Sequence, residues 1–296
     1  MNYELFCTFA LNMKPLISFI ITYHNEPEAL LKACLESVRA LRLAEDEAEI
    51  IVVDDGSEVR PEGNFLYVHQ EQSGLSMARN TGLSHAQGQY IQFVDADDCL
   101  IPSVYEAVLE HLRKDLPDLL LFKMSNINNV YEKCPVPRKS SGVDFLQNHN
   151  LRASACAYVF RRDILGDLRF QPGLLHEDEL FTPQLFWKAK TLLELDAKAY
   201  FYRQHSGTIT SSKSSEKVQK RLNDIRFIIS ELKSLSEPVL ERRIRQLTVD
   251  YLQKTWALTH SLRELRKRMK ELRKDGFLPL PVRSYSLRYF LASLVV

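Results

Sequence analysis

The chain has 296 residues, a formal net charge of +1 and 45% hydrophobic residues. This length allows one large domain or two modest ones, and the near-neutral charge predicts no bulk attraction to nucleic acid. No apolar run approaches the roughly 20 residues of a membrane-spanning helix. The five cysteines lack C-x-x-C spacing, which favours reduced thiols in a cytosolic chain over a disulfide framework or a zinc site.

Residues 1–13 are expected to be a leader or a disordered extension. Residues 1–12 (MNYELFCTFALN) are mildly apolar, but they have neither a basic start nor a small-residue cleavage site. They are therefore not predicted to be a signal peptide. A second methionine, Met13, stands just before the first clear strand signal.

Strand and helix signals then alternate along the chain. The continuous apolar run at 16–22 predicts a strand covered on both faces, and Pro27 is well placed to open a helix. Further strands are predicted at 49–53, 65–69, 90–94 and 119–124, with helices at about 75–86 and from near Pro102. This alternation predicts an α/β fold, a mostly parallel sheet flanked by helices.

Three polar clusters, at 23–26, 54–57 and 95–98, follow predicted strands. In parallel α/β sheets the ligand lies outside the carboxyl ends of the strands, so the three clusters are expected to converge there. The second cluster, Asp-Asp-Gly-Ser, suits a nucleotide pocket, because a carboxylate accepts from a base or a ribose and glycine allows close approach. A plain turn of the same composition is the alternative.

The third cluster carries three carboxylates, Asp95, Asp97 and Asp98, directly after an apolar strand. Carboxylates this close repel one another, and a hard divalent cation bound through oxygen would offset the repulsion. The alternative is a solvated acidic turn that caps the next helix. Asp98 in particular is interpreted as the cap of the helix near Pro102.

The pattern loosens after about Val130. Polar loops are expected at 131–142 and 206–215, strands at 155–160, 192–195 and 199–203, and helices at 216–235 and 238–274. Glu177 and Asp178 stand where another helix begins, and either could be a helix cap or a general base. His205, Arg79 and Arg203 could bind a ligand, although isolated residues of these types are mostly structural or solvated.

Residues 17–98 also carry four ordered motifs, which are ISFIITYHNE, EIIVVDDGS, SGLSMARNTGL and YIQFVDADD. Together they resemble the family 2 glycosyltransferases, which have the GT-A fold. HEDELF (176–181) and YRQHSGTIT (202–210) are similar to later motifs of bacterial polysaccharide-type members. Beyond about Ser215 the resemblance is only general.

The resemblance implies inverting transfer from a nucleotide-diphosphate-sugar, foremost a UDP-sugar, to a glycan or lipid-linked acceptor in cell-surface polysaccharide synthesis. It implies Mg²⁺ or Mn²⁺ at Asp97 and Asp95, with His205 as a third candidate ligand. Asp178 would be the catalytic base, with Glu177 beside it. The remaining implied contacts, to the nucleotide, are Thr22, Tyr23, Asn25, Glu26, Asp54, Asp55, Arg79 and Asp95.

The expected domains are a catalytic domain at 14–212 and a helical C-terminal region at 213–296. The catalytic domain divides into a nucleotide-binding half (14–125) and an acceptor-side half (126–212). Residues 241–275 carry 11 Lys and Arg against 5 Asp and Glu, and the apolar stretch 277–296 follows. This pairing suggests a cytoplasmic protein held at the inner face of the cell membrane, while packing of the tail on the domain or a homodimer contact is the alternative.

Two other functions compete with transfer. A non-catalytic nucleotide-sugar-binding or scaffolding protein would be expected to lack the metal or base carboxylates, yet Asp95, Asp97 and Asp178 are present. A sugar-phosphate nucleotidyltransferase would show a glycine-rich phosphate loop with a basic residue after the first strand. YHNEPE, at 23–28, has neither.

Overall fold

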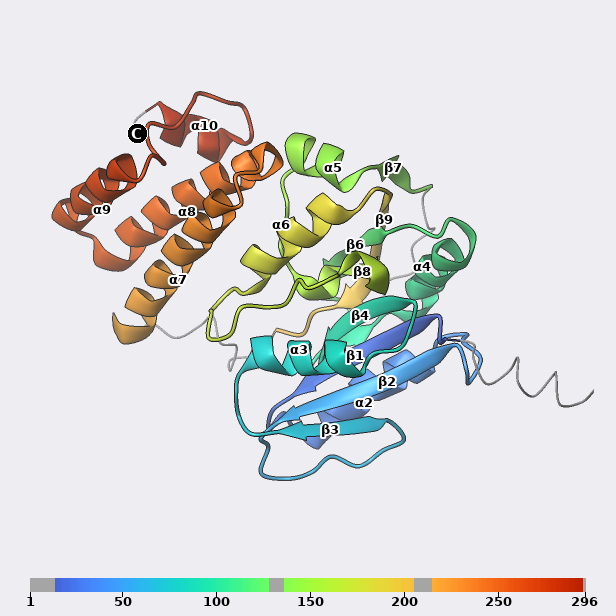
Figure 1. The fold of residues 1–296 in the computed structure, drawn as a ribbon. Coiled ribbons are helices and arrows are strands. Elements are labelled where there is room, and N and C mark those ends of the chain that lie inside the picture. The colour runs from blue at the N-terminus through green and yellow to red at the C-terminus, as the bar shows by residue number, and fades with distance from the viewer. Residues whose placement is uncertain (1–13, 128–135, 205–214, 295–296) are drawn as a thin grey trace, which may run out of the picture. The chain divides into compact units, whose positions relative to one another are not determined.

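The computed structural model describes residues 14–127, 136–204 and 215–294 (Figure 1). The leader at 1–13, His205, residues 131–135 of the first predicted polar loop and most of the second lie outside the described residues. The chain forms two compact units. Unit 1 comprises Met1–Ser141, Ser154–Gly173 and Lys188–His205, and unit 2 comprises Gly142–Ala153, Leu174–Trp187 and Ser206–Val296.

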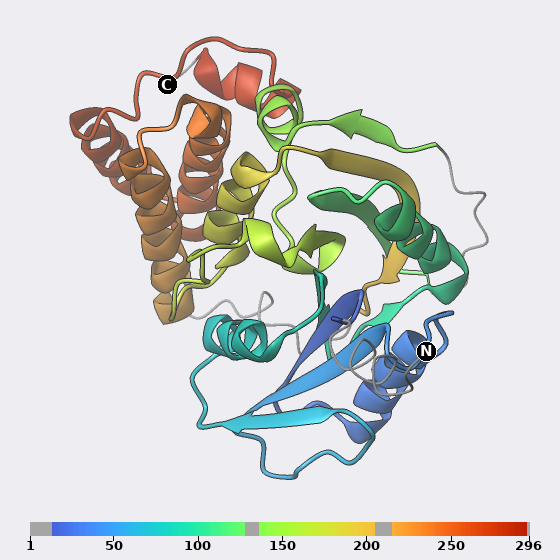
Figure 2. The same cartoon turned by 45° about the vertical axis from the view of Figure 1, so that its right-hand side comes forward.

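Unit 1 begins with the predicted parallel strands. The elements in order are β1 (Ile17–Tyr23), α2 (Glu28–Arg39), β2 (Ala48–Asp55), β3 (Leu66–Gln70), α3 (Leu75–His85) and β4 (Tyr90–Asp95). The strands pair in parallel in the order β3-β2-β1-β4. The helix α3 lies on one face of this part of the sheet and α2 lies on the other (Figures 1 and 2).

Beyond β4 the sheet becomes mixed. Its further strands are β5 (Cys99–Leu100), β6 (Leu119–Ser125), β7 (Arg138–Ser140), β8 (Tyr158–Arg161) and β9 (Leu192–Phe201). The helix α4 (Pro102–Lys114) and the short 3₁₀ helices η1 (Ala155–Ala157) and η2 (Arg162–Ile164) connect them. The strand β8 runs antiparallel to both β4 and β6, whereas β6 and β9 are parallel. The expected α/β architecture is confirmed, with antiparallel pairing in its second half.

Two strand predictions in this half were wrong in detail. The strands predicted at 192–195 and 199–203 are one continuous strand, β9. Leu195, Ala197 and Ala199 are buried at every second position, so the strand alternation continues through the polar residues Asp196 and Lys198. The strand predicted at 155–160 begins as the 3₁₀ turn η1 and becomes extended only at Tyr158.

The core of unit 1 holds α3 close to β1. All seven residues of β1 are buried. On α3, a Cβ at Gly82 would lie 2.2 Å from Cγ2 of Ile20, so only glycine allows the helix to approach this closely. This close contact fixes the position of the whole helix, including Arg79. The thiols of Cys34, Cys99 and Cys156 are buried and unbridged, and Cys7 and Cys134 lie outside the described residues.

Unit 2 is helical. It contains α5 (Gly142–Asn148), most of α6 (Asp178–Lys188), α7 (Ser215–Ser234), the 3₁₀ turn η4 (Pro238–Leu240), α8 (Glu241–Thr259), α9 (Leu262–Lys274) and α10 (Leu287–Ser293). The single helix predicted at 238–274 is broken at His260, which adopts a left-handed conformation with φ 46°. Ser261 then caps α9 by accepting from the Glu264 amide. The Ser-x-x-Glu spacing was a readable start signal.

The segment after α9 packs within unit 2. Leu278, Leu280 and Tyr289 are buried, and Arg226 lies over the ring of Phe277. Within the described ranges, no helix combines the length and the hydropathy needed to cross a bilayer.

Candidate functional site

The ends of β1, β2 and β4 bring the predicted polar clusters together in unit 1. In register, Tyr23 pairs with Asp54 of β2, and Thr22 pairs with Asp95 of β4. Parallel strands in register expose their carboxyl ends at one edge, so these residues stand side by side. The predicted convergence of the three clusters at this edge is therefore present in the structure.

The Asp54 carboxylate is buried and already bound within the protein. One oxygen accepts from the Ser57 amide at 2.8 Å, and the other accepts from the Tyr67 hydroxyl at 2.7 Å. Burial alone would raise the pKa of Asp54, but hydrogen bonds, led by those from Ser57 and Tyr67, outweigh it and lower the pKa. Burial, followed by the hydrogen bond to Asp54, raises the pKa of Tyr67 to about 12. Asp54 is thus an ionised group that shapes the turn.

Asp55 holds the start of α3. Its Oδ1 accepts from the Ser73 amide at 2.8 Å and from the Gln70 side chain at 2.7 Å. Its Oδ2 accepts from the amide of Gly74, the N-cap of α3, at 2.8 Å. A carboxylate at a helix N-terminus is favoured by the helix dipole and satisfies amides that have no partner in the helix. No local sequence pattern indicates this long-range cap.

The loop after β1 is tied to the turn after β2. The Asn25 amide donates to the Ser57 hydroxyl at 3.0 Å, and the Asn25 side chain accepts from the Glu58 amide at 2.9 Å. Asn25 has φ 60°, a conformation that asparagine tolerates well. Burial, and to a smaller extent the charge of Asp97, raises the pKa of Glu26. Glu26 and Asp97 therefore share an electrostatic environment.

Arg79 reaches the end of β4 from α3. Its guanidinium donates to Asp95 Oδ1 at 3.1 Å and is almost fully buried, while the Asp95 side chain remains 35% exposed. The guanidinium also lies over the rings of Phe93 and Phe170. A buried arginine is stable only when its charge is paired. In this structure Arg79 therefore orients Asp95, and its predicted contact with the nucleotide stays a prediction.

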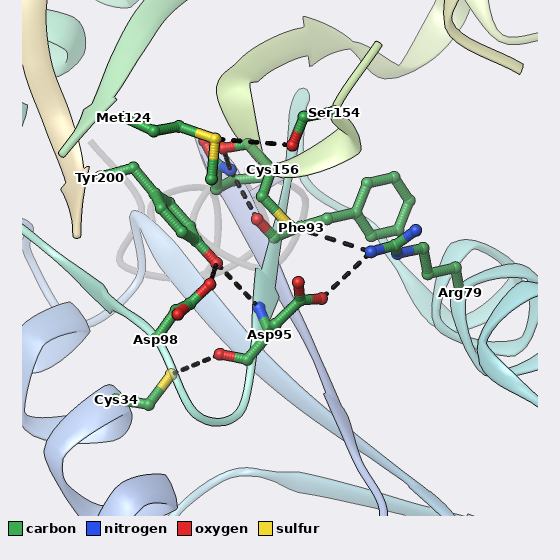
Figure 3. A network of polar contacts seen from close by, with 10 residues as sticks. Cys34, Arg79, Phe93, Asp95, Asp98, Met124, Ser154, Cys156 and Tyr200 are labelled. Carbon is green, nitrogen blue, oxygen red and sulfur yellow. Dashed lines mark hydrogen bonds and ion pairs between the residues drawn. The ribbon is translucent and has the colours of Figure 1, made fainter. Parts of the chain in front are cut away.

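Asp98 was predicted to cap the following helix, and this prediction was wrong. The N-cap of α4 is Ile101. Asp98 is fully buried and accepts from the Arg203 amide at 2.8 Å. It also accepts from the Tyr200 hydroxyl at 2.8 Å (Figure 3). Burial, followed by the charge of Asp95, raises the pKa of Asp98 to about 8.

Tyr200 of β9 and Arg203, which follows it, clamp the turn 95–98 through hydrogen bonds. Neither contact was predicted from the sequence. The Tyr200 hydroxyl accepts from the Asp95 amide at 3.1 Å while it donates to Asp98, as Figure 3 shows. Arg203 donates from Nε to the Asp97 carbonyl at 2.9 Å. The turn is held at both ends, so the partly exposed carboxylates of Asp95 and Asp97 have a fixed backbone beneath them. The only signal was the Tyr-x-x-Arg pattern at the end of a strand.

The residues predicted as catalytic begin α6 in unit 2. Glu177 is buried and Asp178, in the first turn, is partly exposed. Glu179 beside them is paired with Arg243, which also donates to the Leu151 carbonyl at 3.0 Å. These anchors fix the helix start within unit 2. The predicted roles of Glu177 and Asp178 stay predictions.

The preceding residue, His176, has φ 65° and a pKa lowered to about 4, first by burial and then by the charges of Lys254 and Arg221. It is neutral at pH 7. His205, the third candidate metal ligand, lies outside the described residues. Within the described ranges, no three or more His, Cys, Asp or Glu side chains form a group that could hold a metal by themselves.

Known proteins share both the sequence and the fold. The glycosyltransferase EpsJ of Bacillus subtilis (strain 168) is 29% identical over 222 residues, which are 67% of this chain and 64% of EpsJ. The chain thus matches just under two thirds of that relative. Staphylococcus aureus TarS 1–349 in complex with UDP-GlcNAc superposes with a TM-score of 0.67 at 21% identity, over 90% of this chain and 82% of that one.

A more distant structure is the mannosyltransferase PcManGT from Pyrobaculum calidifontis in complex with GDP-Man and Mn²⁺. It has a TM-score of 0.57 at 14% identity and covers 96% of this chain and 87% of its own. These likenesses establish the GT-A fold. The sequence profile of glycosyl transferase family 2 matches residues 18–169, just over half of the chain. The chain therefore belongs to glycosyl transferase family 2.

Proposed function

We propose that the chain transfers a sugar, with inversion, from a nucleotide-diphosphate-sugar to an acceptor hydroxyl in the synthesis of a cell-surface polysaccharide. The proposal is supported by a difference among the carboxylates at the carboxyl edge of the sheet. Asp54, Asp55 and Asp98 are buried and satisfied by the protein, whereas Asp95 and Asp97 remain partly exposed on a clamped turn. In a family 2 chain, such a turn is suited to the donor diphosphate.

The proposed donor is a UDP-sugar. TarS, which shares the fold, has been solved with UDP-GlcNAc, whereas PcManGT has been solved with GDP-Man. The nucleotide would lie over the ends of β1 and β2. The residues proposed to line it are Thr22, Tyr23, Asn25 and Glu26. Asp54 and Asp55, whose oxygens are bonded within the protein, are proposed to serve it by holding the turn 54–57 and the start of α3. A glycan or a lipid-linked saccharide is the proposed acceptor.

A divalent cation fits the residues present. Asp95 and Asp97 offer partly exposed carboxylate oxygens, which are the ligands that Mg²⁺ and Mn²⁺ prefer. Because the described residues supply no complete ligand set, the donor diphosphate and water would have to complete the coordination, as is usual for Mg²⁺ in phosphate-transferring sites. Bound there, the cation would stabilise negative charge on the departing diphosphate.

The chain's own groups would divide the remaining work. Arg79 fixes the orientation of Asp95, and Tyr200 and Arg203 hold the backbone of the turn. We propose Asp178 as the general base that takes the proton from the acceptor hydroxyl. Its partial exposure supports this assignment over Glu177, which is buried. The predicted location at the inner membrane face and the predicted homodimer stay predictions.

The first experiment identifies the donor. Thermal unfolding of the full chain would be followed with UDP-, GDP-, ADP- and dTDP-sugars, each with Mn²⁺ and with EDTA. We expect stabilisation by UDP-sugars that depends on Mn²⁺, because ligands that bind only the folded state raise its stability. Stabilisation by no nucleotide sugar, with or without the metal, would contradict the proposal.

The second experiment separates binding from chemistry. Asp178→Asn should abolish transfer while leaving metal-dependent donor binding intact, since an amide cannot take up the proton. Glu177→Gln is the matched control and should retain measurable turnover if it folds. Undiminished transfer by Asp178→Asn would move the base elsewhere. Donor binding by the unaltered chain without any transfer, tested across glycan acceptors, would favour a non-catalytic sugar-nucleotide-binding protein.

A further inference from the structure

The helix α10 has one face firmly held by unit 2. Tyr289 is buried, its hydroxyl donates to the Pro281 carbonyl at 3.1 Å, and its ring centroid lies 4.8 Å from that of Tyr285. Arg288 pairs with Asp250 of α8 at 2.6 Å. These contacts fix the rotation of α10 about its axis. They therefore also fix which side chains face outward.

The outward face of α10 is a row of large apolar side chains. Leu287, Phe290, Leu291 and Leu294 are 75%, 37%, 54% and 59% exposed. Their spacing (i, i+3, i+4, i+7) places them within an arc of about 100° on a helix. Single exposed apolar residues are common, but a contiguous row of four on an anchored helix marks an interaction surface. We call these four residues the apolar row.

The helix α9 presents a second, cationic surface. Six of its exposed residues are basic and fall within an arc of about 120° at 100° per residue. They are Arg263, Arg266, Lys267, Lys270, Arg273 and Lys274, called here the basic arc. The one exposed acid of the helix, Glu271, lies at its margin. Among residues 14–127, 136–204 and 215–294, none of the six pairs with a carboxylate.

Inward residues of α9 hold it to its neighbours. Leu272 is fully buried, and Arg268 is paired with Glu264 and donates to the Tyr251 hydroxyl of α8 at 2.8 Å. Both α9 and α10 pack against α8, as Figure 1 shows. The basic arc and the apolar row are therefore displayed by a single packed group of helices.

The combination selects one kind of partner. In a symmetric contact between two copies, the basic arc of one copy would face the same six cations of the other, and these would repel each other. An anionic lipid bilayer satisfies both surfaces, because its headgroups attract the basic arc and its acyl boundary takes up the apolar row. We propose that α9 and α10 dock unit 2 on the surface of an anionic membrane. The proposal does not rest on the proposed transferase activity.

The first test removes charge from the basic arc. The full chain would be sedimented with vesicles of equimolar phosphatidylcholine and phosphatidylglycerol, and with vesicles of phosphatidylcholine alone. We expect binding only to the anionic vesicles, weakening as salt is raised. Lys267→Glu with Lys270→Glu should weaken it by about 25-fold or more, at about fivefold per cation lost. The matched control, Lys32→Glu with Lys190→Glu, makes the same net charge change at exposed sites elsewhere and should retain far more binding.

The second test removes apolar surface. Leu287→Asn with Leu291→Asn should weaken anionic vesicle binding by about tenfold or more, because two exposed leucines no longer enter the acyl boundary. Leu116→Asn with Leu235→Asn, two exposed leucines outside α10, is the matched control and should bind normally. Far-UV circular dichroism would verify that each variant is folded.

Three outcomes would overturn the proposal. The unaltered chain could fail to bind anionic vesicles at low salt. The Lys32→Glu, Lys190→Glu control could lose as much vesicle binding as the Lys267→Glu, Lys270→Glu variant, which would mean that only the net charge of the chain matters. The unaltered chain could instead be a dimer by light scattering that Leu287→Asn with Leu291→Asn converts to a monomer, with vesicle binding unchanged, and then the apolar row would cover a second copy.

Discussion

Two acidic turns stand at the same edge of the sheet, residues 54–57 after β2 and residues 95–98 after β4. In the first, both carboxylates are buried and accept hydrogen bonds from amides and side chains of the protein. In the second, Asp98 is buried and bonded in the same way, whereas Asp97 and Asp95, which pairs with Arg79, stay partly exposed. Similar sequences at equivalent strand ends thus provide scaffold in one turn and ligand-binding oxygens in the other.

The difference arises from the donors within reach. After β2 the chain returns through β3 to the start of α3, which brings the amides of Ser73 and Gly74 to Asp55. After β4, Tyr200 of β9 and Arg203 just beyond it bond the backbone of the turn and Asp98. Of the residues that the structure describes, only Arg79 reaches the Asp95 carboxylate. An acidic motif therefore defines a place in the fold, and the neighbouring donors decide which of its carboxylates can bind a ligand.

The largest expected effect is on activity and comes from the second turn. Asp97→Asn should lower transfer by about 1000-fold, because it removes a ligand and a charge from the proposed cation site. Unfolding by urea should show a loss of less than about 1 kcal/mol, as is usual for a partly exposed side chain. A variant with near-normal transfer at saturating Mn²⁺ would remove Asp97 from the metal site.

The next effect is on stability and comes from the first turn. Asp55→Ala leaves the amides of Ser73 and Gly74, at the start of α3, and the Gln70 side chain without their acceptor. We expect a loss of about 3 kcal/mol in the free energy of unfolding, measured by urea denaturation. If Asp55→Ala were as stable as the unaltered chain but lost donor binding, Asp55 would be a ligand-binding residue and the first turn would not be purely structural.

A smaller effect should appear at the β9 clamp. Tyr200→Phe removes the hydroxyl that links the Asp95 amide to Asp98. We expect a stability loss of about 1 to 2 kcal/mol and a several-fold rise in the Mn²⁺ concentration needed for half-maximal donor binding, with kcat little changed. The control is Tyr90→Phe, because the buried Tyr90 hydroxyl has no hydrogen-bond partner in the described part of the chain. Equal shifts in both variants would rule out a positioning role for Tyr200.

The smallest effect concerns pH. The Asp54 pKa is lowered in the folded chain, so its contribution to stability is present above the ordinary value of 3.8 and is lost as the pH falls through the lowered value. Tyr67→Phe removes one donor to Asp54 and should cost about 1 kcal/mol at pH 7. The difference from the unaltered chain should narrow below pH 4. A difference that stayed constant in urea titrations from pH 7 to pH 3 would contradict this account.

The sequence predicted the parts of the site that depend on local pattern. Apolar runs ending in polar clusters predicted β1, β2 and β4 and the convergence of Thr22, Asp54 and Asp95. The convergence follows from one rule, that the carboxyl ends of parallel strands meet at one edge of the sheet. The break at His260 could also have been read, since Ser261 and Glu264 form a capping pattern.

What the sequence could not predict depends on contacts between distant segments. Asp98 was interpreted as a helix cap because the next helix is only four residues away, whereas its donors come from residues 200 and 203. Asp55 finds its amides 18 and 19 residues onward. No single-sequence pattern reports which side chain will meet which amide across a sheet, so the division between scaffold and ligand groups emerged only from the structure.

The clamp from β9 has a consequence for the order in which the site can assemble. Tyr200 and Asp98 are 102 positions apart in the chain, and Arg203 lies 105 positions from Asp98. Contacts of such long sequence separation form late, after the loops between them have closed. A fragment covering only the predicted nucleotide-binding half, 14–125, would contain every carboxylate of the turn and none of its clamp. Competence for donor binding should therefore arise only when β9 has joined the sheet, which would keep a nascent or clipped chain from capturing the nucleotide sugar.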